Sequence, residues 1–191
     1  MDKKHLIILA GLPGTGKTTS AKKLVENFGG YELIIQNDLR RSLGMKKLGK
    51  TQERVLRTLD KRVNECLSDG CGVIIDSVHR YLFRRHQLYG IASGCGTNVI
   101  TIETKCSEEE AKRRMLARQS SDNLLSDPRS SKVYHRISQL WEEIDLDFKY
   151  PGENHVSYMI YDTEKNQIYK KRVTLGMKSF VDKIKYTLLK Y

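Results

Sequence analysis

The sequence predicts an α/β fold, a three-layer sandwich whose central sheet is mainly parallel and is covered by helices on both faces. Short apolar runs, which are typical of buried strands, alternate with helical segments along the chain. The first run, residues 6–9, passes through a glycine-rich turn into a helix at residues 20–27, which Gly29 and Gly30 close. Strands that alternate with helices of this length form parallel sheets, and parallel sheets need cover on both faces.

The elements that follow continue this alternation. Further strands are expected at residues 33–37, 72–76 and 98–104. Helices are expected between them, from about residue 51 to residue 68 and from residue 80 to residue 92. Because ligands of such folds bind beyond the carboxyl ends of the strands, polar residues at those ends are the first candidates for a functional site.

The last part of the chain adds a helix, a polar loop and a hairpin. A capping-box pattern from Ser107 to Glu110 opens a helix, and the polar residues 120–131 predict a loop. A further helix at about 132–148 precedes a hairpin and a terminal amphipathic helix; the hairpin strands are expected at residues 156–161 and 167–173. We expect one domain, residues 1–191, with a helical lid at about 107–131 and the C-terminal hairpin and helix at about 155–191.

Composition narrows the class of protein. The 34 basic and 23 acidic residues give a formal net charge of +11, which favours a polyanionic partner over a neutral one. A solvated basic surface is the alternative explanation of that charge. No apolar run has the length of a membrane span, and the four cysteines form no C-x-x-C pair, so we expect a cytoplasmic protein with reduced thiols and no membrane partner.

The most specific motif follows the first strand. Residues 11–18 fit G-x-x-x-x-G-K-[ST], the loop whose backbone N–H groups cradle phosphates at a helix N-terminus. Lys17 is predicted to reach the β- and γ-phosphates of a nucleoside triphosphate, and the Thr18 hydroxyl to ligate Mg²⁺. The residues expected to bind ATP in this loop are Gly11, Pro13, Gly14, Thr15, Gly16, Lys17, Thr18 and Thr19.

Two acidic residues at strand ends are candidates for chemistry. Asp76 closes the third strand and is predicted to hold Mg²⁺, directly or through water, although an N-cap or turn role is the alternative. Asp38 forms a D-x-x-R pattern with Arg41, so Asp38 is predicted to accept a proton from an acceptor hydroxyl while Arg41 orients that acceptor. Ser77 follows Asp76 where a hydrolase would place a water-activating Glu, which favours transfer to a bound acceptor.

Arginines of the predicted lid form the third group. Arg114 and Arg118 are four residues apart, which would place them on one helix face beside the polar loop. They are predicted to close over the triphosphate and to neutralise charge as the γ-phosphoryl group leaves, and Arg129 in the loop is a weaker candidate. A solvated basic face is the alternative.

Together these motifs resemble the phosphate-loop kinases related to the phage-type polynucleotide 5′-hydroxyl kinase. The resemblance covers about the first 145 residues and implies a P-loop NTPase-type fold that uses ATP and Mg²⁺. It implies that Lys17 and Thr18 bind the nucleotide and the metal, that Asp38 is the general base, and that Arg41 contacts the acceptor. It also implies that Arg114 and Arg118 hold the donor phosphates. Zeta-type toxins and adenylylsulfate kinases share a similar loop and similar Asp-containing motifs.

Three functions are therefore open. The first is an ATP-dependent kinase acting on the 5′-hydroxyl of a polynucleotide, favoured by D-x-x-R together with the positive charge. The second is a small-molecule kinase with the same Asp38 chemistry, whose substrate could itself be phosphorylated. The third is a nucleotide-dependent binding protein that transfers no phosphate.

Overall fold

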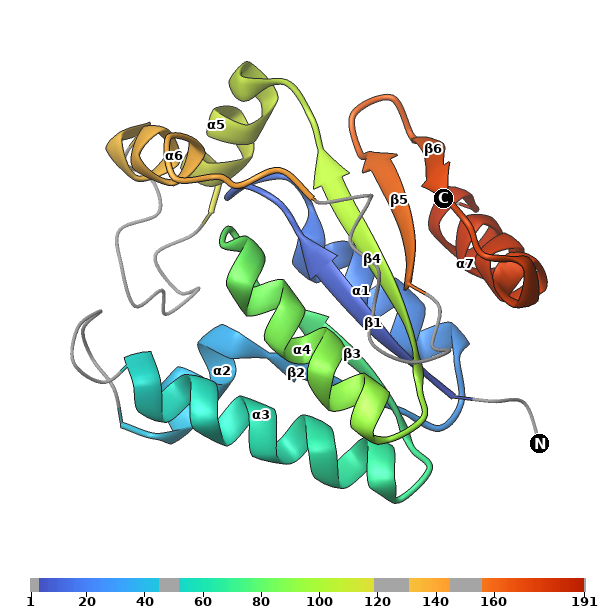
Figure 1. The fold of residues 1–191 in the computed structure, drawn as a ribbon. Helices are drawn as coiled ribbons and strands as arrows, with labels where there is room; N and C mark the ends of the chain where they lie inside the picture. The colour runs from blue at the N-terminus through green and yellow to red at the C-terminus, as the bar shows by residue number, and fades with distance from the viewer. Residues whose placement is uncertain (1–3, 45–51, 119–130, 145–155, 191) are drawn as a thin grey trace.

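The centre of the computed structural model is a six-stranded sheet with the strand order β2-β3-β1-β4-β5-β6. The structure describes residues 4–44, 52–118, 131–144 and 156–190. Helices cover both faces of the sheet, as Figure 1 shows, which confirms the α/β class and the three layers. Among the helices in these ranges, none combines the length and the apolar content that a bilayer crossing requires.

Most elements lie close to where the sequence predicts them. The strands are β1 (His5–Ala10), β2 (Tyr31–Ile35), β3 (Gly72–Asp76), β4 (Asn98–Lys105), β5 (Val156–Asp162) and β6 (Gln167–Arg172). The helices are α1 (Lys17–Asn27), α2 (Gln36–Ser42), α3 (Gln52–Ser68), α4 (Leu82–Gly94), α5 (Glu108–Leu116), α6 (Ser131–Ser138) and α7 (Lys178–Leu189), with a 3-10 turn at Leu175–Met177.

The pairing of the strands brings their carboxyl ends to one edge. Strands β1 to β5 all run in the same direction, and β6 pairs antiparallel with β5 as the second strand of the predicted hairpin. In the register, Asp76 lies opposite Leu9 of β1 on one side and Ile35 of β2 on the other. The carboxyl ends of β1, β2 and β3, which the predicted site residues follow or occupy, therefore lie at the same edge of the sheet. The alternation of strands and helices predicts this arrangement.

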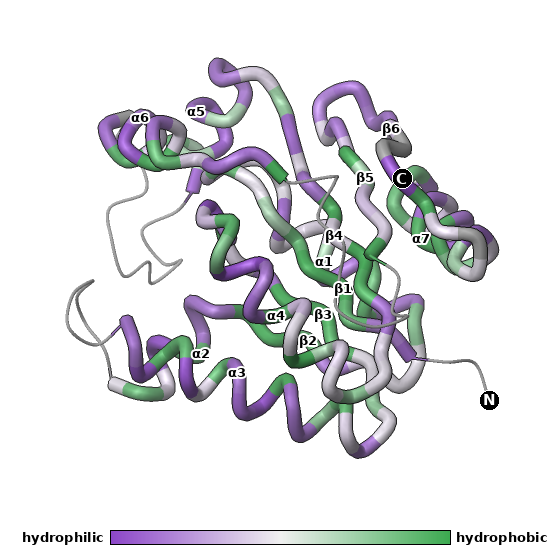
Figure 2. The backbone as a smooth tube through the Cα atoms, viewed as in Figure 1, coloured by the Kyte–Doolittle hydropathy of each residue, from purple (hydrophilic) through white to green (hydrophobic). Residues whose placement is uncertain are grey.

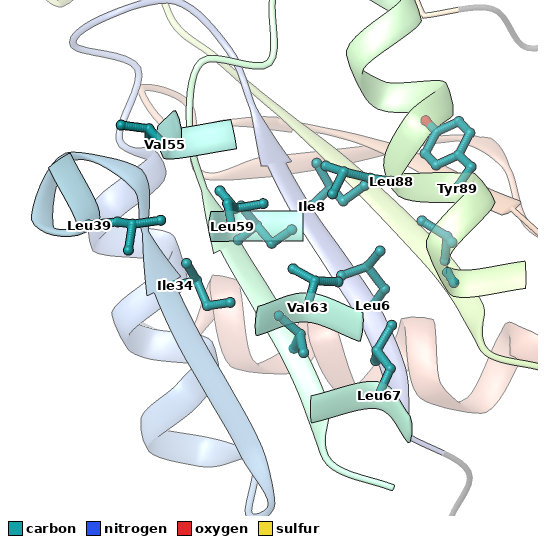
Figure 3. Packing of buried hydrophobic residues seen from close by; sticks show 14 residues of the cluster. Leu6, Ile8, Ile34, Leu39, Val55, Leu59, Val63, Leu67, Leu88 and Tyr89 are labelled. Atoms are coloured by element: carbon teal, nitrogen blue, oxygen red, sulfur yellow. The ribbon is translucent and has the colours of Figure 1, made fainter. Parts of the chain in front are cut away.

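Two apolar layers hold the sheet to its helices. One face packs against α3 and α4, where Val63 and Leu88 meet Leu6 and Ile8 of β1 (Figure 3). The other face packs against α1 and α7, through Leu24 and Ile184 among others. Figure 2 shows hydrophobic residues concentrated on the central strands, while most of α5 is hydrophilic. Because β1 is buried from end to end, it is apolar from Leu6 to Ala10 rather than alternating.

Several predicted boundaries were wrong. The strand expected at residues 33–37 ends at Ile35, because Gln36 turns into α2 and its side-chain oxygen accepts a hydrogen bond from Ser77. The helix expected at 132–148 ends at Ser138, where its last turn tightens and Leu140 donates its N–H to Ile137. The part of that prediction at 145–148, and the polar loop with Arg129, lie outside the described residues.

The capping box at the start of α5 forms only in part. The Ser107 hydroxyl accepts the Glu110 N–H at 3.2 Å, as the pattern predicts. The Ser107 N–H, however, donates to Glu164 at 2.8 Å, because Glu110 is engaged by Arg113 and Arg114 on its own helix. The hairpin tip between β5 and β6 thus completes the helix cap and fastens α5 to the sheet.

Candidate nucleotide-binding site

The loop between β1 and α1 has the backbone that its glycines predict. Gly14 and Gly16 have φ angles of 83° and 91°, a left-handed region that residues with a Cβ rarely adopt. A Cβ on Gly14 would lie 2.3 Å from the Ala111 carbonyl oxygen, so the loop is also in close contact with α5. Gly16 is the N-cap residue of α1, which places the helix N-terminus directly behind the loop.

Contacts with β4, with the β5–β6 hairpin tip and with the segment after β3 hold this loop in place. The Thr15 hydroxyl is buried and lies 2.7 Å from both the Leu12 carbonyl oxygen and the Thr104 hydroxyl of β4. Thr163, at the tip of the β5–β6 hairpin, donates its hydroxyl to the Thr15 carbonyl at 3.1 Å. On the other side, the Gly11 N–H donates to the Val78 carbonyl, just past β3. The loop is therefore preformed. The Thr15 hydroxyl contributes to holding the loop's conformation, and Pro13 lies in its turn.

Lys17 opens α1 with its ammonium turned back onto the loop. Its Nζ donates to the Leu12 carbonyl oxygen at 2.8 Å. Burial lowers the pKa of Lys17 from 10.5 to about 8, Asp76 partly opposes this shift, and Arg118 adds to it by like-charge repulsion. Arg118 and Asp76 are therefore both close enough to Lys17 to act on its charge.

Thr18 and Asp76, the two sequence-predicted Mg²⁺ ligands, are in direct contact. The Thr18 hydroxyl donates to the Asp76 Oδ2 at 2.5 Å, although the two residues are 58 positions apart in sequence. Asp76 is 5% exposed, whereas Thr18 and Thr19 lie on the exposed side of the first turn of α1. A hydroxyl and a carboxylate at one point form the oxygen donor set that Mg²⁺ prefers.

Asp38 and Arg41 lie on α2, beyond the end of β2. Their side chains form an ion pair and are 52% and 42% exposed, respectively. The start of α2 is tied to β3 by the hydrogen bond between Ser77 and buried Gln36. Asp38 and Arg41 thus contact each other, on a helix whose first residue is hydrogen-bonded to Ser77, the neighbour of Asp76.

The two predicted lid arginines do not share a helix face. Arg114 is inside α5, but α5 ends at Leu116, and the Arg118 N–H bonds the Met115 carbonyl in a tighter turn. Arg114 is held by Glu110 at 2.6 Å and by the Thr163 hydroxyl at 2.7 Å, so it joins α5 to the hairpin tip beside the loop. Arg118 therefore lowers the pKa of Lys17, whereas Arg114 connects α5 to the hairpin tip.

Sequence reasoning missed two buried residues that follow Asp76. His79 is 6% exposed and has a φ of 48°, and its Nε2 has no hydrogen-bond partner among the residues that the structure describes. Burial, together with the positive charges of Arg84, Arg85 and Lys17, lowers the pKa of His79 from 6.5 to about 3. Arg85 is fully buried and donates to the carbonyl oxygens of His79, Glu142 and Glu143. Arg85 thus connects the loop after β3 to the segment after α6. In the sequence, Arg84 and Arg85 are only a basic pair in an expected helix, so the burial of Arg85 could not be predicted.

The chain belongs to the AAA_33 family, described as an AAA domain. The family model matches residues 6–137, more than half of the chain, and this match includes the phosphate-binding loop, Asp38 and Asp76.

Two curated relatives are kinases. The chain is 31% identical over 103 residues to an L-seryl-tRNA(Sec) kinase of Methanococcus maripaludis, a match that covers 52% of this chain and 40% of that protein. It is 25% identical over 149 residues to an adenylate kinase of Trichomonas vaginalis, a match that covers 71% of this chain and 62% of the relative. The chain therefore spans less than two thirds of the length of each relative.

A solved structure confirms the fold. Kti12 of Chaetomium thermophilum, crystallised in complex with ADP-AlF3, superposes with a TM-score of 0.59 at 22% identity. The superposition covers 79% of this chain and 87% of that one. At this identity the likeness shows a shared fold, and it does not identify a substrate.

Proposed function

We propose that this protein is an ATP-dependent phosphotransferase that moves the γ-phosphoryl group to the 5′-hydroxyl of a polynucleotide. The observation that carries the phosphotransferase part is the contact between Thr18 and Asp76 beside a loop whose glycine geometry forms a phosphate cradle. The similarity of this chain to two curated kinases supports the same reaction class. ADP-AlF3 bound to a protein of the same fold supports a nucleotide donor.

The donor side consists of the loop, Lys17 and Arg118. The backbone N–H groups of residues 14–18 are proposed to hold the β- and γ-phosphates at the N-terminus of α1. Lys17 exchanges its contact with the Leu12 carbonyl for a phosphate oxygen, and Arg118 approaches from the end of α5. Two cations at the transferring group stabilise the charge that develops on its oxygens.

Thr18 and Asp76 are proposed to hold Mg²⁺. Their oxygen atoms fit that ion, and the 2.5 Å contact shows that both side chains point to the same place. An Mg²⁺ ion held by Thr18 and Asp76 would neutralise negative charge on the phosphate oxygens. The chain's own contribution is to hold the two oxygens on rigid elements, the first turn of α1 and the end of β3.

The acceptor side is proposed to lie on α2. Asp38 takes the proton of the attacking hydroxyl, and Arg41 turns from Asp38 to the acceptor or to a phosphate next to it. Because both side chains are about half exposed, an acceptor can reach them from solvent. Ser77, in place of a water-activating Glu, supports transfer to a bound acceptor rather than hydrolysis.

A polynucleotide acceptor is favoured by the D-x-x-R pair and by the net charge of +11. The L-seryl-tRNA(Sec) kinase among the relatives also acts on an RNA-linked substrate. A second candidate, transfer to a small molecule, is favoured by the likeness to an adenylate kinase, which matches a longer part of the chain.

An acceptor screen with γ-labelled ATP and Mg²⁺ tests the proposal. One arm offers 5′-hydroxyl oligonucleotides of RNA and DNA, each beside a matched oligonucleotide that already carries a 5′-phosphate. The other arm offers nucleoside monophosphates, sugars and adenylylsulfate. Label on the 5′-hydroxyl oligonucleotide alone is the expected result. Label on a small molecule alone overturns the polynucleotide acceptor, and label on no acceptor while ATP binds overturns phosphotransfer.

A further inference from the structure

A large open pocket lies at the opposite end of α1 from the phosphate-binding loop. Its volume is about 1080 Å³, and the end of α1, the starts of β1 and β2, and α7 border it. Helix α1 begins in the loop at Lys17 and ends beside the pocket at Asn27, so its 11 residues separate the two sites by about 16 Å. Figure 1 shows α7 next to α1 on the same face of the sheet.

Aromatic side chains line this pocket. Phe28, Tyr31 and Phe180 form one cluster, in which the Tyr31 and Phe180 rings are stacked with 11° between their planes. Tyr186, one turn and a half further along α7, is 67% exposed. Exposed rings at a concave surface are platforms on which nucleic-acid bases stack, whatever the base.

Lysines lie among these rings. Lys4, Lys178 and Lys183 line the pocket, and Asp182 is the one acidic residue among its lining residues. Lys4 lies 5.3 Å from the centroid of the Tyr31 ring, and Lys190 lies 5.6 Å from that of Tyr186. Cations beside aromatic faces match a ligand that has both phosphates and flat bases.

We propose that this pocket binds a single-stranded segment of nucleic acid, with a base stacked on Tyr186 and backbone phosphates beside Lys178 and Lys183. The inference goes beyond the proposed phosphotransfer, since the site is remote from the loop and binds without ATP. It also gives a role to the basic C-terminal part of the sequence, which the nucleotide site does not use. An acidic protein segment would match the lysines but not the exposed ring, so base stacking distinguishes the two ligands.

Fluorescence anisotropy with a labelled single-stranded oligonucleotide of about ten nucleotides, without ATP, tests the pocket. Tyr186→Ala should weaken binding at least about fivefold, because one base loses its stacking partner. Tyr186→Phe keeps the ring and should bind like the wild type. Lys183→Ala should lower the slope of log affinity against log salt by about 0.7. The matched controls Tyr169→Ala, on β6, and Lys61→Ala, on the opposite face, should change neither quantity.

Three results would overturn the proposal: no binding of the oligonucleotide, equal binding by Tyr186→Ala and the wild type, or equally tight binding of polyglutamate of the same charge. Because Tyr186 is mostly exposed, its truncation should leave the fold intact, and ATP binding by calorimetry checks this. Lys17→Ala should keep oligonucleotide binding while losing transfer. A protein that binds the oligonucleotide but phosphorylates no acceptor therefore disproves the phosphotransfer and leaves the pocket standing.

Discussion

The proposed donor and acceptor halves of the candidate site are built in different ways. On the donor side, Gly14 is too close to Ala111 for any side chain, Thr15 is locked to Thr104, and Asp76 is 5% exposed. On the acceptor side, Asp38 and Arg41 contact each other and are about half exposed. A triphosphate is the same in every enzyme that uses it and can be held by backbone, whereas an acceptor is recognised by a few side chains. This difference explains why the sequence predicts phosphate binding more plainly than it predicts an acceptor.

Asp38→Asn tests whether the two halves are separable and should have the largest effect. The variant keeps the size of the side chain but cannot take a proton, so transfer should fall about 10²- to 10⁴-fold. ATP affinity should stay unchanged, because Asp38 is not part of the loop. Turnover and ATP binding are measured on the same preparation, with Asp69→Asn, an exposed acid after α3, as the control. Wild-type turnover would remove Asp38 from the role of base.

Lys17→Ala tests the donor half. It removes a preorganised cation from the transferring phosphate, so turnover should fall at least about 10²-fold and ATP should bind more weakly. Steady-state kinetics and calorimetry measure the two effects, and Lys22→Ala, an exposed lysine on the same helix, should affect neither. Unchanged kinetics in the Lys17 variant would show that the loop holds its phosphates by backbone alone.

Elements determined by local sequence could be predicted, whereas contacts between distant parts of the chain could not. The buried strand β3 was predicted at its exact bounds, because a strand covered on both faces is continuously apolar. The phosphate-binding loop was equally clear, since its conformation demands glycine at fixed spacing. Contacts set by tertiary structure were not predictable. Thr163 touches Thr15 from 148 residues away, and Arg85 is buried because the segment after α6 supplies its acceptors.

His79 is buried in the loop after β3, and its protonation should appear in the stability of the fold. The pKa of His79 is about 3 in the folded protein and 6.5 in an unfolded chain, so only the unfolded state gains a proton between these values. Stability should therefore fall as pH decreases below 6.5, by about 1.4 kcal/mol per pH unit from this group. Urea unfolding at pH 6.5, 5.5 and 4.5 measures the slope. His79→Asn tolerates the same φ and should have a shallower slope; parallel slopes would contradict the assignment.

Of the predicted effects, the uptake of protons on nucleotide binding is the smallest. It reports on Lys17 and therefore on the proposed donor half alone. The pKa of Lys17 is about 8 in the free protein because its ammonium is buried beside the loop, so about half of the molecules carry the proton at pH 8. Triphosphate oxygens at the ammonium favour the charged form, so binding at pH 8 should take up about half a proton, and binding at pH 6 almost none. Calorimetry in two buffers of different ionisation enthalpy measures this uptake. Lys17→Arg stays charged at both pH values and should abolish it. Equal uptake by the wild type and Lys17→Arg would show that another group titrates, and that the triphosphate does not reach Lys17.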